Sequence, residues 1–222
     1  MSERIRVLIV DDHRMFGEAL TMLLRAEHSI EMVAALERAE EALDLCRRDP
    51  PDVVLMDLDL PGTDGIEATR LLKQFAPQVQ VVALTALQRP EVIARAAEVG
   101  ACGYVLKTRA PAELVNVIRQ AAAGEIVMSP PDLPAVLSKI SPEPNRVQIG
   151  YPFERLTSRE VEILDRIAAG ASTAEIAQSL YISRFTVQSH VKSILSKLGV
   201  HSKLEAVTFG LKHGIIEISA SA

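Results

Sequence analysis

The sequence of 222 residues has no tryptophan, three tyrosines, five phenylalanines and only two cysteines. Cys46 and Cys102 lack metal-ligand spacing, so we expect two buried thiols in a reducing compartment rather than a disulfide framework or a metal centre. The apolar runs, such as Val79 to Leu84, are far shorter than the roughly 18 residues of a membrane span. The N-terminus passes directly into a short apolar run, which lacks the length and the cleavage site of a signal peptide. We therefore expect a cytoplasmic protein without membrane contact.

The net charge is also small: 24 basic and 29 acidic residues give −5. Taken whole, that balance argues against nucleic-acid binding. It is uneven along the chain: residues 1–130 carry 14 basic and 20 acidic side chains, and residues 154–222 carry 8 and 7. The segment 184–212 alone carries five basic residues and one acidic residue. Two ends of different charge indicate two domains with different functions.

Proline is concentrated between these two parts. Such a stretch is typical of a semi-rigid linker, and its apolar residues 135–140 favour one short helix. The apolar fraction of 48% is enough to build a core on either side. We therefore place a first domain at 4–125, a linker at 126–152 and a second domain at 153–218.

The first domain alternates β-branched runs with helical stretches. The expected strands are Ile5–Val10, Glu31–Ala35, Val53–Met56, Val79–Leu84 and Gly103–Leu106. The expected helices are Met15–Ala26, Ala39–Arg48, Gly65–Phe75, Pro90–Val99 and Pro111–Ala123. Because the strands are continuously apolar, both sheet faces should be covered, which predicts an α/β domain with a doubly wound parallel (βα)5 sheet. In such sheets the chemistry lies at the carboxyl ends of the strands.

Polar residues stand at these carboxyl ends: Asp11, Asp12, Asp57, Thr85 and Lys107. One strand-end aspartate is often only a helix cap, but five such residues at one edge predict a site. Three close carboxylates repel one another, each pair by roughly 4 kcal/mol at an effective dielectric near 20. Mg²⁺ prefers carboxylate oxygens and would offset this repulsion, with Lys107 as a second positive charge. The set suits phosphoryl transfer onto a carboxylate.

The residues around these positions carry a resemblance to a known family. They are Val10-Asp11-Asp12-His13, Met56-Asp57-Leu58-Asp59-Leu60-Pro61-Gly62-Thr63-Asp64-Gly65, Leu84-Thr85-Ala86 and Gly103-Tyr104-Val105-Leu106-Lys107. The segment 4–125 resembles the receiver domain of bacterial two-component response regulators. The resemblance implies that Asp57 accepts a phosphoryl group from a sensor histidine kinase.

The same resemblance implies roles for the neighbouring residues. Mg²⁺ would be held by Asp11, Asp12, Asp57 and the backbone carbonyl of Asp59. The phosphoryl group would be bound by Thr85 and Lys107, and Tyr104 would change rotamer with Thr85 as a switch.

Two of these assignments have a plain alternative. Read alone, Tyr104 is a half-buried strand aromatic. Asp59 is acidic two positions after the acceptor, where relatives vary. If its side chain points into the site, its charge should disfavour the phosphorylated state or slow attack by water. Alternatively, it is a solvated loop carboxylate.

Residues 153–218 predict a small all-α domain. Three capping boxes, Thr157-x-x-Glu160, Ser172-x-x-Glu175 and Ser202-x-x-Glu205, mark helix starts. Glycines 170 and 199 mark helix ends. The expected four helices are therefore 158–169, 173–180, 184–198 and 203–213.

The third of these helices has two distinct faces. Its buried stripe should be Val187, Val191, Ile194 and Leu198. The opposite face, which contains no acid, carries Phe185, Gln188, Ser189, Lys192 and Ser196. A short helix, a tight turn and a helix with such an outer face predict a helix-turn-helix whose second helix enters the DNA major groove. The alternative is an ordinary helical bundle with a solvated face.

A second resemblance covers this domain. It rests on Leu156-Thr157-Ser158-Arg159-Glu160, Glu175-Ile176-Ala177, Ile182-Ser183, Thr186-Val187, His190-Val191 and Lys197-Leu198-Gly199-Val200, which resemble the LuxR-type DNA-binding domain. Receiver and LuxR-type domains together are similar to the NarL/FixJ response regulators. The resemblance implies a helix-turn-helix near residues 173–192 and dimers on paired half-sites. We expect DNA contacts from Arg184, Phe185, Gln188, Ser189, Lys192, Ser196 and Lys197. Gln188 replaces a lysine common in that family, but glutamine can pair bidentately with adenine.

We therefore expect a phosphorylation-activated transcription regulator that binds double-stranded DNA. Its other expected partners are a sensor histidine kinase, RNA polymerase and a second copy of the chain. We do not expect an enzyme, beyond its own phosphoryl transfer and autodephosphorylation. One alternative is a haloacid dehalogenase phosphatase, since Asp57-Leu58-Asp59 is an Asp-x-Asp, although that family's nucleophile follows the first strand. Another is a binding module that works without phosphorylation, against which the complete acidic set argues.

Overall fold

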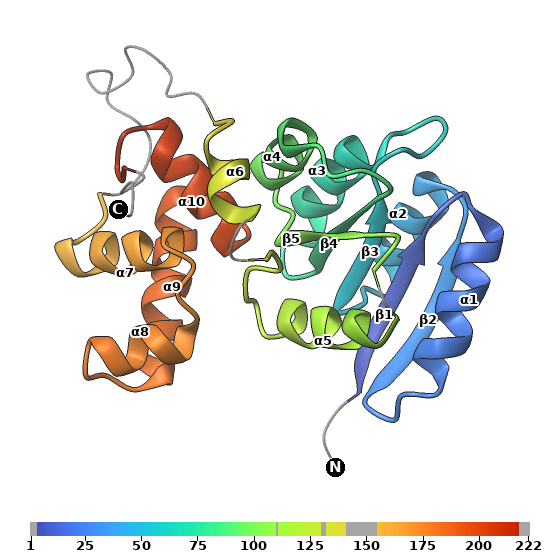
Figure 1. Cartoon of the computed structure of the whole chain (residues 1–222), viewed down its shortest axis with the longest axis horizontal. Coiled ribbons are helices and arrows are strands. Elements are labelled where there is room, and N and C mark those ends of the chain that lie inside the picture. The colour runs from blue at the N-terminus through green and yellow to red at the C-terminus, as the bar shows by residue number, and fades with distance from the viewer. Residues whose placement is uncertain (1–3, 110, 130–131, 141–154, 218–222) are drawn as a thin grey trace.

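The computed structural model describes residues 4–109, 111–129, 132–140 and 155–217. A parallel sheet with flanking helices forms the N-terminal part, and a group of helices forms the C-terminal part (Figure 1). The strands are β1 (Ile5–Val10), β2 (Ile30–Leu36), β3 (Val53–Asp57), β4 (Gln80–Thr85) and β5 (Gly103–Leu106), in the spatial order β2-β1-β3-β4-β5. This arrangement confirms the predicted doubly wound sheet.

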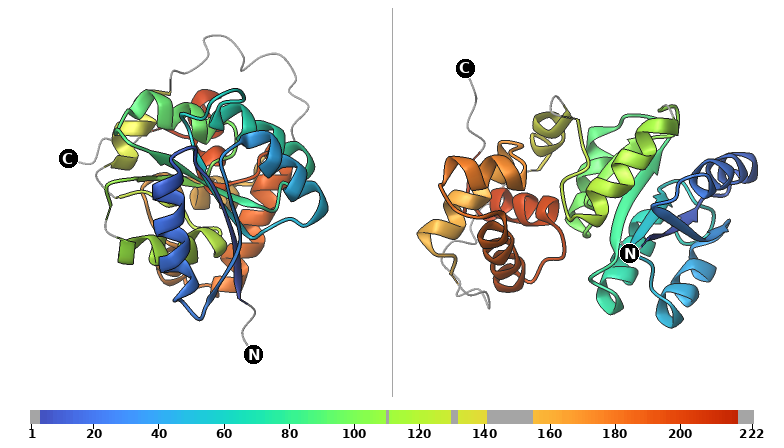
Figure 2. Two further views of the ribbon diagram at one scale, coloured as in Figure 1. Left: turned by 90° about the vertical axis from the view of Figure 1, so that its right-hand side faces the viewer. Right: turned by 90° about the horizontal axis from the view of Figure 1, so that it is seen from below.

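Five helices cover the sheet: α1 (Arg14–Arg25), α2 (Ala39–Arg48), α3 (Gly65–Phe75), α4 (Pro90–Glu98) and α5 (Pro111–Ala122). Helices α1 and α5 lie on one face of the sheet (Figure 2). Val7 and Ile9 pack against residues of these two helices. The other face packs Leu8 and Val10 with residues of α2 and α3. Successive strand residues point to opposite faces, and both faces are covered, so each strand is apolar throughout.

The chain stays with the sheet beyond residue 125. Val127 forms a parallel bridge with Gly103, and its carbonyl accepts a 2.9 Å hydrogen bond from the Tyr104 amide. A Cβ at Gly103 would lie 1.9 Å from the Val127 carbonyl oxygen, so this close approach requires glycine. The first linker residues therefore extend the edge of the sheet.

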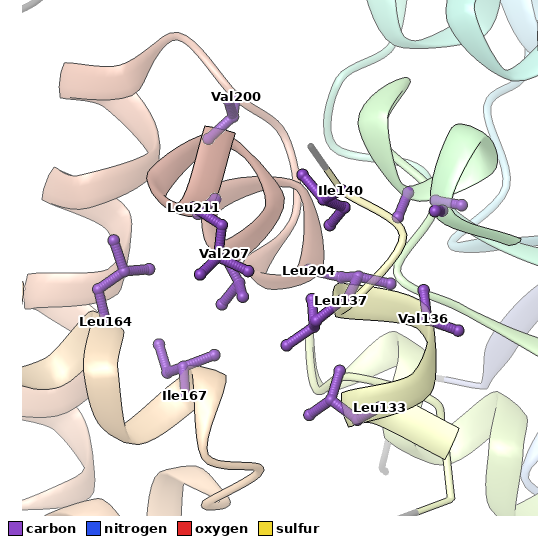
Figure 3. Packing of buried hydrophobic residues seen from close by; sticks show 14 of the residues in the cluster. Leu133, Val136, Leu137, Ile140, Leu164, Ile167, Val200, Leu204, Val207 and Leu211 are labelled. Atoms are coloured by element: carbon purple, nitrogen blue, oxygen red, sulfur yellow. The ribbon is translucent and has the colours of Figure 1, made fainter. Parts of the chain in front are cut away.

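The linker helix differs from the prediction. Helix α6 spans Asp132–Leu137, three residues earlier than the expected start at residue 135. Pro134 falls in its first turn, where a missing amide hydrogen costs nothing. Leu133, Val136 and Leu137 are buried in a cluster that includes residues of both domains (Figure 3). Helix α6 of the linker is therefore part of the hydrophobic core and does not act as an exposed spacer.

The C-terminal domain consists of α7 (Ser158–Ala168), α8 (Thr173–Ser179), α9 (Arg184–Leu198) and α10 (Lys203–Lys212). Complete capping boxes begin α7 and α8, as expected. At α10 the Ser202 hydroxyl accepts from the Glu205 amide, but the Glu205 carboxylate accepts from the His201 amide instead of returning to Ser202. Gly199, at a φ of 67°, ends α9 in the left-handed region.

The two domains contact each other through α4, α6 and α10. The Ser202 hydroxyl donates a 3.1 Å hydrogen bond to the Ala101 carbonyl. The Lys203 ammonium lies 2.7 Å from a Glu125 carboxylate oxygen. Nearly every residue of α10 from 203 to 211 is buried in this arrangement. In the part of the chain that the structure describes, none of the helices has the length and apolarity to cross a membrane.

Candidate functional site

The carboxyl ends of β1 and β3 meet at one edge of the sheet, as the sequence predicts. Asp57 ends β3 with 1% exposure, and Asp11 follows β1 with 2%. Asp11, Asp12, His13 and Asp57 each offer a ligand atom, and these atoms lie within 4.8 Å of one another. The cluster therefore has the donor set and the spacing of a cation site.

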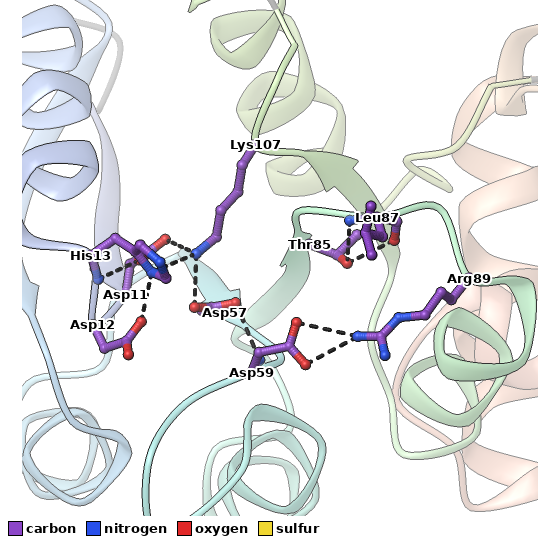
Figure 4. Close-up of polar contacts among 9 residues, drawn as sticks. All are labelled: Asp11, Asp12, His13, Asp57, Asp59, Thr85, Leu87, Arg89 and Lys107. Atoms are coloured by element: carbon purple, nitrogen blue, oxygen red, sulfur yellow. Dashed lines mark hydrogen bonds and ion pairs between the residues drawn. The ribbon is translucent and has the colours of Figure 1, made fainter.

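Lys107, just past β5, joins the two buried carboxylates (Figure 4). Its ammonium lies 2.7 Å from Asp11 Oδ2 and 2.8 Å from Asp57 Oδ2. Burial raises the pKa of Asp57 above its usual range, although the lysine opposes the shift. The pKa of Lys107 is raised, because its contacts with Asp11 and Asp57 outweigh its desolvation. One cation among three carboxylates leaves the cluster negative, which favours a further cation.

His13 is a member of this cluster that the sequence reasoning missed. Its Nδ1 lies 2.7 Å from Asp12 Oδ1 and 3.3 Å from Asp11 Oδ1. Its backbone amide donates a 2.8 Å hydrogen bond to Asp11. Its position directly after the acidic pair was the signal for its presence at the site.

The loop after β3 is held against the strand end. A Cβ at Gly65 would lie 1.9 Å from the Asp57 carbonyl oxygen, so only glycine lets α3 begin this close. Asp64 caps α3 by accepting a 2.7 Å hydrogen bond from the Glu67 amide. The Asp59 amide donates to Asp57 Oδ1 at 3.2 Å and so orients the buried carboxylate. These contacts within the segment that follows β3 therefore hold the Asp57 carboxylate in its position.

The Asp59 side chain does not point into the cluster. Both of its oxygens contact Arg89 Nη2, at 3.1 and 3.2 Å. The solvated alternative is therefore the better description, since the Asp59 side chain is 58% exposed, and in its loop it also forms an ion pair with Arg89. Arg89 precedes α4, so the partner could not be read from local spacing.

Thr85 and Tyr104 each have their hydroxyl engaged elsewhere than with Asp57. Thr85 Oγ1 donates to the Leu87 carbonyl at 2.9 Å. Tyr104 is only 5% exposed, and its hydroxyl donates to Asp132 Oδ2 at 2.7 Å. Burial, together with this hydrogen bond, raises the pKa of Tyr104. The aromatic of β5 is therefore buried and connected to the linker helix.

The outer face of α9 lies open. Its exposed residues are Arg184, Phe185, Gln188, Ser189, Lys192 and Ser196, and its buried residues are Val187, Val191, Ile194 and Leu198, as predicted. Phe185 is 77% exposed, so its ring is accessible on this face. The Ser189 hydroxyl donates to the Phe185 carbonyl at 3.0 Å and is thus occupied within the helix.

Lys197 differs from the other expected DNA contacts. Its ammonium lies 2.9 and 2.8 Å from the two carboxylate oxygens of Glu160, which is only 3% exposed. Ser193 also donates to Glu160, at 2.7 Å. The sequence identified Glu160 only as a capping residue, because its partners lie more than thirty positions away along the chain. The Lys197 ammonium is therefore bound to Glu160 within the C-terminal domain.

Comparison with known proteins covers both parts of the chain. Residues 7–119 match the response regulator receiver domain, and residues 154–209 match the bacterial regulatory proteins of the luxR family. The response regulator protein VraR of Staphylococcus aureus is 35% identical over 213 residues, covering 96% of this chain and 99% of VraR.

Solved structures show the same two-part similarity. The response regulator ChrA of a heme-sensing two-component system is 31% identical, with a TM-score of 0.51 and coverage of 96% of this chain and 99% of ChrA. The response regulator RcsB in complex with DNA is 25% identical, with a TM-score of 0.55 and coverage of 95% and 99%.

Proposed function

The chain belongs to the response regulators that join a receiver domain to a DNA-binding domain of the luxR family, and it acts as a transcription regulator; from this membership we propose that phosphorylation of Asp57 controls it. One observation carries the proposal. Asp57 is a buried carboxylate at a strand end, 2.8 Å from Lys107 and grouped with two further acids.

The proposed chemistry is transfer of a phosphoryl group from a kinase phosphohistidine. An Asp57 oxygen forms a bond to phosphorus as the bond from phosphorus to the histidine nitrogen breaks, which leaves an acyl phosphate. Lys107 then holds a phosphoryl oxygen by its charge. Thr85 donates its hydroxyl to another phosphoryl oxygen, after leaving the Leu87 carbonyl.

The acidic cluster fits Mg²⁺, because its carboxylates converge and their charge exceeds that of Lys107. We propose Asp11, Asp12 and Asp57 as its ligands, together with the Asp59 carbonyl. When bound, the ion offsets the charge of the phosphoryl oxygens. The receiver thus catalyses its own phosphoryl transfer and later hydrolysis, without acting on other substrates.

The proposed target of the second domain is duplex DNA, read by the exposed face of α9. RcsB has been solved as dimers bound to DNA, and we propose that this chain also binds paired half-sites as a dimer. We propose that Arg184 and Lys192 contact phosphates and that Phe185 and Gln188 contact base edges, since all four side chains are exposed on this face. A sensor histidine kinase and RNA polymerase complete the proposed set of partners.

The test is incubation with acetyl phosphate and Mg²⁺, followed by intact-mass measurement. Wild type should gain one phosphoryl group, and Asp57→Ala should gain none. Asp59→Asn is the matched control, since it removes a neighbouring carboxylate that contacts Arg89 instead of the cluster. No gain in wild type, or a gain that survives Asp57→Ala, contradicts the proposal. Turnover of phosphate esters would favour the phosphatase alternative instead.

A further inference from the structure

The first residue of α6 collects hydrogen bonds from three segments. Asp132 Oδ2 accepts from the Tyr104 hydroxyl at 2.7 Å and from the Ser129 hydroxyl. Asp132 Oδ1 accepts from Gln88 Nε2 at 2.6 Å. We name these four residues the Asp132 cluster. It ties the linker helix to β5 and to the loop between β4 and α4.

The helix that begins at Asp132 contributes to the contact between the domains. Figure 3 shows Leu133, Val136 and Leu137 beside Leu204 of α10, and all four belong to one buried cluster. Lys139 adds an ion pair of 2.9 Å with Glu91 of α4. A displacement of α6 would therefore remove apolar surface from between α4 and α10.

Tyr104 adjoins Thr85 through the sheet. Ala83 pairs with Tyr104 and Thr85 pairs with Leu106, so Thr85 and Tyr104 project from the same face of adjacent strands as diagonal neighbours. The Thr85 hydroxyl is also bonded to the Leu87 carbonyl, next to Gln88. Movement of Thr85 toward Asp57 would thus disturb two of the donors to Asp132.

We propose that Asp132 is a positioning residue that holds α6, and with it the domain contact, only while Tyr104 and Gln88 keep their present orientations. Phosphorylation, by drawing Thr85 toward Asp57, breaks the Asp132 cluster and frees α6. This inference rests on the proposed function for its trigger, although the cluster itself does not depend on phosphorylation.

The charge state of Asp132 makes its carboxylate a strong hydrogen-bond acceptor. Although desolvation opposes the shift, hydrogen bonds from Ser129, Tyr104 and Gln88 lower the pKa of Asp132. The carboxylate is therefore ionised at neutral pH, and hydrogen bonds to a charged acceptor are the stronger kind. Loss of one such bond shifts an opening equilibrium by roughly tenfold or more.

The first experiment measures amide hydrogen exchange of residues 132–140 in the full chain without a phosphodonor. Tyr104→Phe keeps the ring and removes the donor, and it should exchange about tenfold faster in this segment. Asp132→Asn should do the same, and the double variant should be no faster than the faster single variant. Tyr181→Phe and Asp44→Asn, at exposed positions, are the matched controls.

A second variant separates the cluster from general instability. Gln88→Ala alters an exposed residue and should accelerate exchange in 132–140 while leaving β1 unchanged. Equal acceleration in β1 and α6 would show global destabilisation and overturn the inference. Wild-type exchange in both Tyr104→Phe and Gln88→Ala would overturn it as well.

The second experiment adds acetyl phosphate and Mg²⁺ and records mass and exchange in the same sample. Phosphorylated wild type should exchange at least as fast as unphosphorylated Tyr104→Phe, and phosphorylation should accelerate exchange less in Tyr104→Phe than in wild type, because only the Gln88 bond is left to break. If the hydrogen bond from Tyr104 to Asp132 were purely structural, phosphorylation would accelerate exchange by the same factor in wild type and in Tyr104→Phe. A mass gain without faster exchange overturns the inference and leaves the proposed function intact. Absence of a mass gain contradicts the proposed function, and the first experiment still decides the cluster.

Discussion

Arg89 forms an ion pair with Asp59 through a single nitrogen that contacts both carboxylate oxygens, at 3.1 and 3.2 Å. The pair joins the loop after β3 to the residue before α4, beside the acidic cluster (Figure 4). An acid close to Asp57 in sequence thereby has its charge offset by a residue thirty positions away. Its effect on Asp57 must therefore be tested together with that of Arg89.

The first prediction concerns the lifetime of phosphorylated protein. Asp59→Asn should change the autodephosphorylation rate by less than about twofold, because the removed charge was already paired. Arg89→Ala should have the larger effect, since it leaves an unpaired carboxylate near the phosphoryl group. Adding Asp59→Asn to Arg89→Ala should return the rate toward wild type. Phosphate release measures all four proteins, and additive effects would refute coupling between the two residues.

The second prediction concerns Lys107 and Mg²⁺. Lys107→Met leaves two buried carboxylates without their cation, which should destabilise the protein by about 3 kcal/mol when no Mg²⁺ is present. Mg²⁺ should then stabilise the variant more than it stabilises wild type. Thermal unfolding with and without Mg²⁺ measures both effects. Equal Mg²⁺ stabilisation of the two proteins would show that Lys107 and the ion do not balance the same charges.

The third prediction concerns acid stability. Despite its desolvation, the pKa of Glu160 is lowered to about 2 by Lys197, the Thr157 backbone and Ser193. Its stabilisation is thus complete above the unfolded pKa near 4.5 and is lost as pH falls toward 2. The loss is on the order of 3 kcal/mol.

Glu160→Gln should destabilise the protein at pH near 7 and flatten the pH dependence between about 4.5 and 2. Urea unfolding followed by circular dichroism measures it, since the chain has no tryptophan to report by fluorescence. Glu175→Gln is the matched control, because this capping glutamate is exposed and accepts hydrogen bonds from Ser172. An unchanged pH profile in Glu160→Gln would contradict the assignment.

The fourth prediction separates two lysines of α9. Lys192→Ala should reduce the salt dependence of DNA binding by about one phosphate contact, because its side chain lies on the exposed face. Lys197→Ala should leave the salt slope unchanged and lower the stability, because its ammonium is bound to Glu160. DNA-binding titrations over a range of salt concentrations, together with unfolding curves, compare the two variants. A reduced slope in Lys197→Ala would restore it as a DNA contact.

The fifth prediction concerns the bases that α9 contacts. Phe185 is an apolar group suited to a thymine methyl, and Gln188 can pair with adenine. Selection on random DNA should therefore yield half-sites with A·T pairs. Uracil in place of the contacted thymine should weaken wild type, and Phe185→Ala should not respond to the exchange. Equal loss in both proteins would place the methyl contact on another residue.

Local patterns in the sequence specify the order of the elements, the parallel sheet and the edge at which its acids gather. Continuous apolar strands and helical periodicity are local patterns, and a parallel sheet brings its carboxyl ends to one edge whatever the side chains are. Asp11, Asp57 and Lys107 were therefore brought together as predicted. The buried apolar stripe and the exposed face of α9 were likewise predicted from the helical spacing of its apolar residues.

The partner of each polar side chain depends instead on how the elements pack in three dimensions. Arg89 with Asp59, Lys197 with Glu160, and Tyr104 with Asp132 join segments 28 to 37 positions apart. This three-dimensional arrangement likewise decided that α6 begins at Asp132 and packs between the domains. Periodicity encodes which face of an element is buried, but a hydrogen bond depends on distances of about 3 Å between elements. Those distances are set only when the layers pack.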